Sequence, residues 1–150
     1  MEKAICSSPG KILWIGAYAI LHKGNVGHVI TVNKRLYAEA EIIKENKIEV
    51  AIPQLSIKAI GMFDEEKYVV KFQGLNEKEA NYIKFVKSAI ETTFEYLNIN
   101  KLEKVKGLRI ITWNDPEFTT TYGKSGLGGS AAVTVATIAS IMKCYGYDIK

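Results

Sequence analysis

The sequence predicts an α+β domain, and three observations lead to that fold class. Over the first half of the 150 residues, apolar and polar residues alternate with the period of two that half-buried strands show. After residue 76, apolar residues recur at helical spacing instead. A further strand, a glycine-rich loop and a second apolar helix then complete the chain. Strands first, followed by a strand–loop–helix unit, are the arrangement of an α+β domain, and the length suits one domain.

Strands are predicted in the first 75 residues from short apolar runs and from alternation. Apolar or β-branched runs occupy Ala4–Ser8, Ile12–Ile15 and His28–Val32. Alternating apolar positions predict four more strands, at Leu36/Ala38/Ala40/Ile42, Ile48/Val50/Ile52, Leu55/Ile57/Ala59 and Tyr68/Val70/Phe72. Polar residues separate the later strands, so we expect an antiparallel meander with one face open to solvent.

Two helices are predicted in the second half. Asn76 followed by Glu79 is a capping-box pattern, and the apolar spacing after it predicts a helix over Glu77–Leu97. A strand over Leu108–Trp113 separates this helix from the next. The second helix, Ser130–Tyr145, is apolar nearly all round, so we expect it to be buried on most sides.

Composition and charge narrow the function classes. The chain is 47% hydrophobic and 24% charged, as soluble globular proteins are. Its net charge of +4 comes mostly from lysines that usually lie near glutamates, because Arg35 and Arg109 are the only arginines. This pattern indicates a solvated surface and not a nucleic-acid-binding stripe, although a mildly positive field suits anionic substrates.

Two cysteines and the absence of targeting signals predict a cytoplasmic protein with no membrane partner. Cys6 and Cys144 lie far apart in apolar surroundings, without metal-type spacing, so we expect two buried free thiols in a reducing compartment. The sequence shows no signal peptide, transmembrane run or lipidation motif.

A glycine-rich loop precedes the second helix. Gly123, Gly126, Gly128 and Gly129 leave the backbone before Ser130 nearly bare, so successive N–H groups can point into one anion-binding concavity. A helix that begins directly after such a loop adds its dipole. The loop is neither a Walker A loop nor a Rossmann fingerprint. The alternative is a tight turn whose glycines serve only close packing; phosphate binding is favoured.

Two polar side chains extend this hypothesis. Lys124 adds a positive charge at the mouth of the loop. Ser130, at the helix start, has three possible roles: capping the helix, touching a phosphate oxygen or holding Mg²⁺.

Near the other end of the chain, Lys11 follows a rigid Pro9-Gly10 approach into a strand, which suits a cation needed at a developing phosphoryl charge. Taken alone, Lys11 reads as an ordinary edge-strand lysine.

Together, these segments resemble the GHMP kinase family. Pro9-Gly10-Lys11-Ile12-Leu13-Trp14-Ile15-Gly16 with Tyr18-Ala19-Ile20-Leu21 resembles the first family motif, and Gly126-Leu127-Gly128-Gly129-Ser130-Ala131-Ala132 resembles the second, the ATP loop. The motifs stand in the family order and span most of the chain. The resemblance implies a GHMP kinase N-terminal domain (ribosomal protein S5 domain 2-like) over residues 1–150. This domain would be incomplete, and the C-terminal GHMP domain would be absent or supplied by a second chain.

Within the family, the chain is most similar to the phosphomevalonate kinase branch. Mevalonate and galactose kinases usually carry Gly-Glu-His where this chain has Gly16-Ala17-Tyr18. A tyrosine at this position is similar to phosphomevalonate kinases, and Lys124 before the glycine loop also resembles the phosphomevalonate kinase branch. The resemblance implies transfer of a phosphoryl group from ATP to 5-phosphomevalonate, giving 5-diphosphomevalonate for isoprenoid synthesis. The alternatives are another GHMP kinase, such as mevalonate or homoserine kinase, or a non-catalytic nucleotide-binding module.

The resemblance also implies roles for individual residues. Lys11 would serve catalysis and substrate binding, and Tyr18 would shape the acceptor pocket, unless Tyr18 is a core tyrosine. Ser130 would lie near Mg²⁺. The ATP-binding residues would be Lys124, Ser125, Gly126, Leu127, Gly128, Gly129, Ser130 and Ala131.

The chain departs from the family pattern in three places. Gly129 replaces a serine and removes one hydroxyl from the phosphate cradle, and Ala17 replaces the acidic residue of mevalonate kinases. The family's catalytic aspartate and third glycine-rich motif would lie beyond Lys150. The context of that aspartate is not matched by Asp64, Asp115 or Asp148.

Four further residues are given packing or surface roles. His22 and His28 are expected in loops or at the surface, because no partner spacing for catalysis accompanies them. Trp14 is expected in the core. Trp113 could edge an adenine pocket, but a packing role is favoured.

Overall fold

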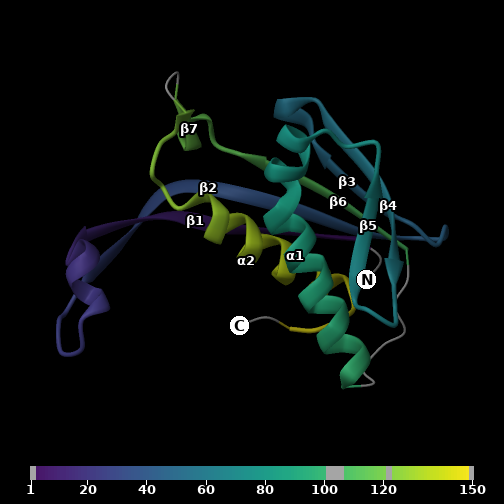
Figure 1. Cartoon of the computed structure of the whole chain (residues 1–150), viewed down its shortest axis with the longest axis horizontal. Coiled ribbons are helices and arrows are strands. Elements are labelled where there is room, and N and C mark those ends of the chain that lie inside the picture. Colours follow the sequence, from purple (N-terminus) through teal and green to yellow (C-terminus); the bar gives the residue numbers. More distant parts are fainter. Residues whose placement is uncertain (1–2, 101–106, 121–122, 149–150) are drawn as a thin grey trace.

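The computed structural model describes residues 3–100, 107–120 and 123–148, which form one mixed sheet with two helices on one of its faces (Figure 1). The strands of this sheet are β1 (Lys3–Ile15), β2 (His28–Ile43), β3 (Ile48–Ile52), β4 (Ile57–Asp64), β5 (Val69–Gln73) and β6 (Gly107–Asn114). The helices are α1 (Glu77–Ile99) and α2 (Gly129–Cys144). A short ribbon of β7 (Thr119–Thr120) and β8 (Gly123–Lys124) precedes α2. The α+β class is confirmed.

The strand order is β1-β2-β6-β3-β4-β5, so the expected meander is wrong. β6 enters between β2 and β3, antiparallel to β2 and parallel to β3. A parallel neighbour requires a crossover connection, and α1 lies within the one that leads from β5 to β6. The central place of β6 agrees with the complete burial of Leu108 and Ile110. The other pairings are antiparallel, as expected.

The first two strands are longer than the sequence pattern predicted. β1 and β2 each join two predicted strands into one continuous hairpin, paired from Lys3↔Glu41 to Ile15↔His28. The register shifts between Pro9 and Lys11, where a proline without an N–H is tolerated on an edge strand. The far part of this hairpin, residues 12–29, extends away from the helices (Figure 1), and we call it the arm.

Two strand boundaries differ from the predicted ones. Leu55, expected in a strand, ends the short 3-10 helix η2 (Pro53–Leu55), and Ser56 follows with a φ of 54°. The next strand therefore begins at Ile57. Tyr68 also has a φ of 54° and lies in the turn before β5, not in the strand.

The first helix begins as predicted. The Asn76 side chain accepts from the Glu79 N–H at 2.9 Å, and the Glu79 carboxylate accepts from the Asn76 N–H at 3.0 Å, which completes the capping box. The buried face of α1 packs on the sheet and forms the main core with Ile48, Val50 and Ile110. The helix contributes Ile83, Val86, Ile90, Phe94 and Leu97 to this core.

The second helix is less enclosed than expected. Ala132 and Ala136 belong to a smaller core cluster, while Val135 is 56% exposed. At its C-terminal end, Cys144 is buried and donates to the Ala40 carbonyl at 2.9 Å, and burial raises the pKa of this thiol. Cys6 is only half-buried, so the expectation of two buried thiols is met by one of them.

The face of the sheet opposite the helices is open to solvent, as predicted. It carries charged pairs, among them Lys3–Glu39 and a network in which Arg109 bridges Glu41 and Glu49. In the part of the chain that the structure describes, neither helix is long and apolar enough to cross a membrane.

Candidate nucleotide site

The two glycine-bearing motifs meet in space although they lie far apart in the sequence. The Lys11 N–H donates to the Leu127 carbonyl at 2.9 Å, which ties β1 to the glycine loop. A Cβ added at Gly128 would lie 2.9 Å from Cγ of Lys11, so the lysine stem rests directly on this glycine. Gly128 also has a φ of 71°, which favours glycine. Close approach and backbone conformation therefore both require the absence of a side chain here.

The loop then leads directly into α2. Gly126 has a φ of 79° and open space where a side chain would stand. Gly128 is the N-cap of α2, in the left-handed conformation, and no side chain caps the helix. The capping role considered for Ser130 is thus wrong. Uncapped N–H groups at a helix start, together with its dipole, suit an anion such as a phosphate.

Two serines flank this turn. The Ser125 hydroxyl is buried, and among the described residues it has no hydrogen-bond partner. Such an orphaned group is suited to a ligand oxygen. Ser130 lies in the first turn of α2, where its carbonyl accepts from the Thr134 hydroxyl at 2.9 Å.

The bare backbone and the serine hydroxyls at the loop fit the phosphates of a nucleotide such as ATP, and Mg²⁺ would be bound chiefly through those phosphates. Among the described residues, no group of three or more His, Cys, Asp or Glu side chains could form a metal site. Mg²⁺ commonly binds through substrate phosphates with only one or two protein ligands, and a serine hydroxyl is one suitable kind. Ser130 therefore stays the predicted protein ligand.

Lys124 and Ala131 lie at the two ends of the loop. The backbone of Lys124 pairs with Thr119 in the β7–β8 ribbon, but its side chain lies outside what the structure describes. Ala131 is exposed in the first turn of α2.

Lys11 and Tyr18 occupy different parts of the hairpin. Lys11 is exposed at the base of the arm, beside the glycine loop. Tyr18 lies within the arm, in the short 3-10 helix η1 (Ala17–Leu21), and is 86% exposed. The core alternative for Tyr18 is therefore wrong.

Two tryptophans were expected to pack, and only one does. Trp14 is 68% exposed in the arm, so the core prediction is wrong. Trp113 stacks face to face on Tyr37, with ring centroids 5.4 Å apart, in agreement with a packing role. His22 and His28 are exposed, as expected.

Sequence reasoning missed the corner between β6 and the loop. The Arg35 N–H donates to the Asp115 carboxylate at 2.7 Å, and the Asp115 N–H returns to the Arg35 carbonyl at 3.0 Å. Asp115 thus holds the corner to β2. Phe118 follows in the 3-10 helix η3 (Pro116–Phe118) and is buried beside the glycine loop. An aromatic residue between a strand and a glycine loop was the available signal.

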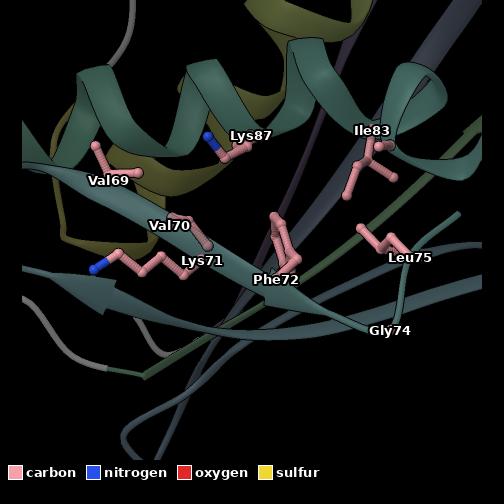
Figure 2. A pocket seen from close by; sticks show the side chains of 9 residues that line it. Val69, Val70, Lys71, Phe72, Gly74, Leu75, Ile83 and Lys87 are labelled. Carbon is pink, nitrogen blue, oxygen red and sulfur yellow. The ribbon is translucent and has the colours of Figure 1, made fainter. Parts of the chain in front are cut away.

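A pocket of about 480 Å³ lies elsewhere, between β5 and α1 (Figure 2). β5 forms the sheet edge opposite β1, so this pocket is separate from the glycine loop. Val70, Phe72 and Ile83 line it. Its two lysines are engaged locally, with Lys71 paired to Asp64 and Lys87 to Glu91. The candidate nucleotide site lies instead at the glycine loop, beside Lys11.

Comparison with known proteins supports the family. Residues 82–150 match the family described as GHMP kinases N terminal domain. The chain is 28% identical over 148 residues to mevalonate kinase of Pyrococcus furiosus, covering 98% of this chain and 41% of that protein. It is 34% identical over 135 residues to phosphomevalonate kinase of Saccharolobus solfataricus, covering 90% of this chain and 34% of that protein.

A solved structure agrees with the fold. The crystal structure of Streptococcus pneumoniae phosphomevalonate kinase in complex with phosphomevalonate and AMPPNP superposes with a TM-score of 0.66 at 18% identity. It covers 97% of this chain and 38% of that one. The described sheet and helices therefore share the α+β fold of that structure. Residues 82–150 thus match a GHMP kinase N-terminal domain, and the chain is similar to two GHMP kinases over 90% and 98% of its own length, while it spans about two fifths or less of the length of these relatives.

Proposed function

We propose that this chain is the N-terminal, ATP-binding part of a small-molecule kinase that phosphorylates 5-phosphomevalonate. The domain would cover residues 1–150, and a C-terminal half would come from a longer polypeptide or from a second chain. The matched relatives are more than twice as long, which supports this division. A cytoplasmic location suits the free thiols of Cys6 and Cys144.

One observation carries the proposal: the Lys11 N–H donates a hydrogen bond to the Leu127 carbonyl. This bond brings a mobile ammonium group to the glycine loop. In our proposal the loop N–H groups and the start of α2 bind the ATP phosphates, and Lys11 neutralises charge on the transferred group. Phosphoryl transfer depends mainly on positioning and charge stabilisation, which these groups provide. Bound Mg²⁺ would add further neutralisation of the phosphate oxygens.

The choice of acceptor depends on the arm. Gly16-Ala17-Tyr18 lacks the acidic residue and histidine that mevalonate kinases usually carry, and a relative at 34% identity is named phosphomevalonate kinase. The exposed ring of Tyr18 is accessible to a ligand. Mevalonate is the second candidate, because another relative covering nearly the whole chain is named mevalonate kinase.

The test uses a polypeptide that contains this chain and its C-terminal continuation, assayed with Mg-ATP and a panel of acceptors. We expect turnover of phosphomevalonate above mevalonate and homoserine. Lys11→Ala should lower kcat by about 100-fold. The matched control is Lys58→Ala, an exposed lysine in β4, which should leave kcat unchanged.

Three outcomes separate the alternatives. Equal or faster turnover of mevalonate would overturn the acceptor. Binding of ATP without transfer to any acceptor would indicate a nucleotide-binding module. Unchanged kcat in Lys11→Ala would remove Lys11 from the catalytic site.

A further inference from the structure

The ring of Phe118 lies between the two glycine-bearing motifs. A Cβ added at Gly10 would lie 3.1 Å from Cζ of Phe118, and one added at Gly129 would lie 3.4 Å from its Cδ1. The ring therefore separates β1 from the first turn of α2 by its own width. Phe118 is only 8% exposed and belongs to the smaller core cluster, against which Leu127 packs.

The backbone of Phe118 also contacts the loop. Its carbonyl accepts from the Ser125 N–H at 3.4 Å, just before the glycines. One residue thus contacts β1 at Gly10, the loop at Ser125 and the start of α2 at Gly129.

The corner that carries Phe118 is anchored to β2. Asp115 exchanges two hydrogen bonds with the Arg35 backbone, and Glu117 pairs with Lys34. The Arg35 side chain donates in turn to the Ser7 hydroxyl at 2.8 Å, in β1. Phe118 is therefore fixed relative to both strands of the hairpin.

We propose that Phe118 is a positioning residue of the nucleotide site, whose ring sets the distance between β1 at Gly10 and the start of α2 at Gly129 and so keeps the glycine loop aligned with Lys11. The inference rests on the proposed function for the identity of the ligand. A shorter side chain lets the loop and α2 settle toward Gly10, which moves the phosphate-binding N–H groups away from their alignment with Lys11. Supporting residues of this kind decide whether a site keeps its productive geometry.

The test compares Phe118→Leu with Phe94→Leu, the same substitution in the main core, far from the loop in the contact pattern. The dissociation constant of Mg-ATP is measured by calorimetry on the polypeptide that contains this chain and its C-terminal continuation, and unfolding in urea is measured in parallel. We expect Phe118→Leu to weaken Mg-ATP binding about tenfold. Phe94→Leu should lower the urea midpoint at least as much yet change the dissociation constant by less than about twofold.

A second measurement does not depend on nucleotide. The rate of hydrogen exchange at the backbone amide of Lys11 reports the hydrogen bond that this amide donates to the Leu127 carbonyl. Phe118→Leu should accelerate this exchange selectively, whereas Phe94→Leu should not. A Cβ added at Gly10 would lie 3.0 Å from Cγ2 of Val32 and 3.1 Å from both the Leu127 carbonyl oxygen and Cζ of Phe118. In the pair Gly10→Ala and Phe118→Leu, the shorter side chain relieves the last of these three contacts, so the double variant should bind somewhat better than the two single effects multiplied.

The outcomes are distinct. Absence of Mg-ATP binding by the unaltered polypeptide with its C-terminal continuation would overturn the proposed function, and the exchange rate of Lys11 would still decide the role of Phe118. If Phe118→Leu and Phe94→Leu change that exchange rate alike, or change Mg-ATP binding alike, the positioning role is wrong.

Discussion

Large apolar side chains are buried in the body of the domain but exposed in the arm. In the body, Ile90, Phe94 and Leu97 are completely buried between α1 and the sheet. In the arm, Trp14 is 68% and Leu21 77% exposed. Isolated apolar side chains at a surface are ordinary, but a group of large ones on one projecting segment marks an interaction site. Apolar side chains thus build a core in one region and remain exposed in the other.

The strongest test of this difference between body and arm is to truncate one aromatic residue in each region and compare the losses of stability. Phe94→Ala should reduce the free energy of unfolding by about 3–5 kcal/mol, because it leaves a cavity in the main core. Trp14→Ala should change it by less than about 0.5 kcal/mol, since its ring is mostly in water already. Urea unfolding measures both. Equal losses would show that the arm packs as tightly as the body.

The second way concerns association. We expect the chain alone to self-associate through the arm, and Leu21→Ser should weaken the association by about tenfold, or about 1.4 kcal/mol. Ile99→Ser, a comparably exposed residue at the end of α1, is the matched control and should have little effect. Sedimentation across a concentration series measures the change. A chain that is monomeric throughout would contradict the interpretation of the arm.

The sequence predicted the body better than the arm for a physical reason. Burial in the body follows from local periodicity, as in the helix that begins at Asn76. Trp14 has the same apolar character, but its exposure depends on how far the hairpin extends beyond α2, which no local pattern encodes. The position of β6 between β2 and β3 likewise depends on a crossover and not on its own residues.

The candidate site was predictable where chemistry is carried by residue type. Glycines at 126 and 128 indicated positive φ, which both adopt. The bond from Lys11 to Leu127 joins residues from opposite ends of the chain, so only the resemblance to a family linked their two motifs. Phe118 was missed because its role consists of contacts with Gly10 and Gly129 that the sequence does not display.

The third prediction concerns a buried polar group in the body that lacks a hydrogen-bond partner. Thr137 is completely buried in α2, and its hydroxyl has no hydrogen-bond partner among the described residues. Thr137→Val should therefore raise the free energy of unfolding by about 1 kcal/mol. The same substitution at Thr93, whose hydroxyl donates to the Ala89 carbonyl at 2.7 Å, should give no such gain. Urea unfolding that shows equal effects at both positions would rule out the orphaned hydroxyl as the cause.

The smallest effect is electrostatic and lies on the open face of the body. Hydrogen bonds from Lys47 and Arg109 hold the pKa of Glu49 below its ordinary value. A lowered pKa in the folded state stabilises the domain above the ordinary pKa of glutamate, and this contribution is lost as the pH falls through the folded value. Glu49→Gln should therefore flatten part of the fall in urea midpoint between neutral and acidic pH. Glu66→Gln, an exposed residue in the β4–β5 turn, is the control, and an identical pH profile for the two variants would contradict a stabilising role for the Glu49 network.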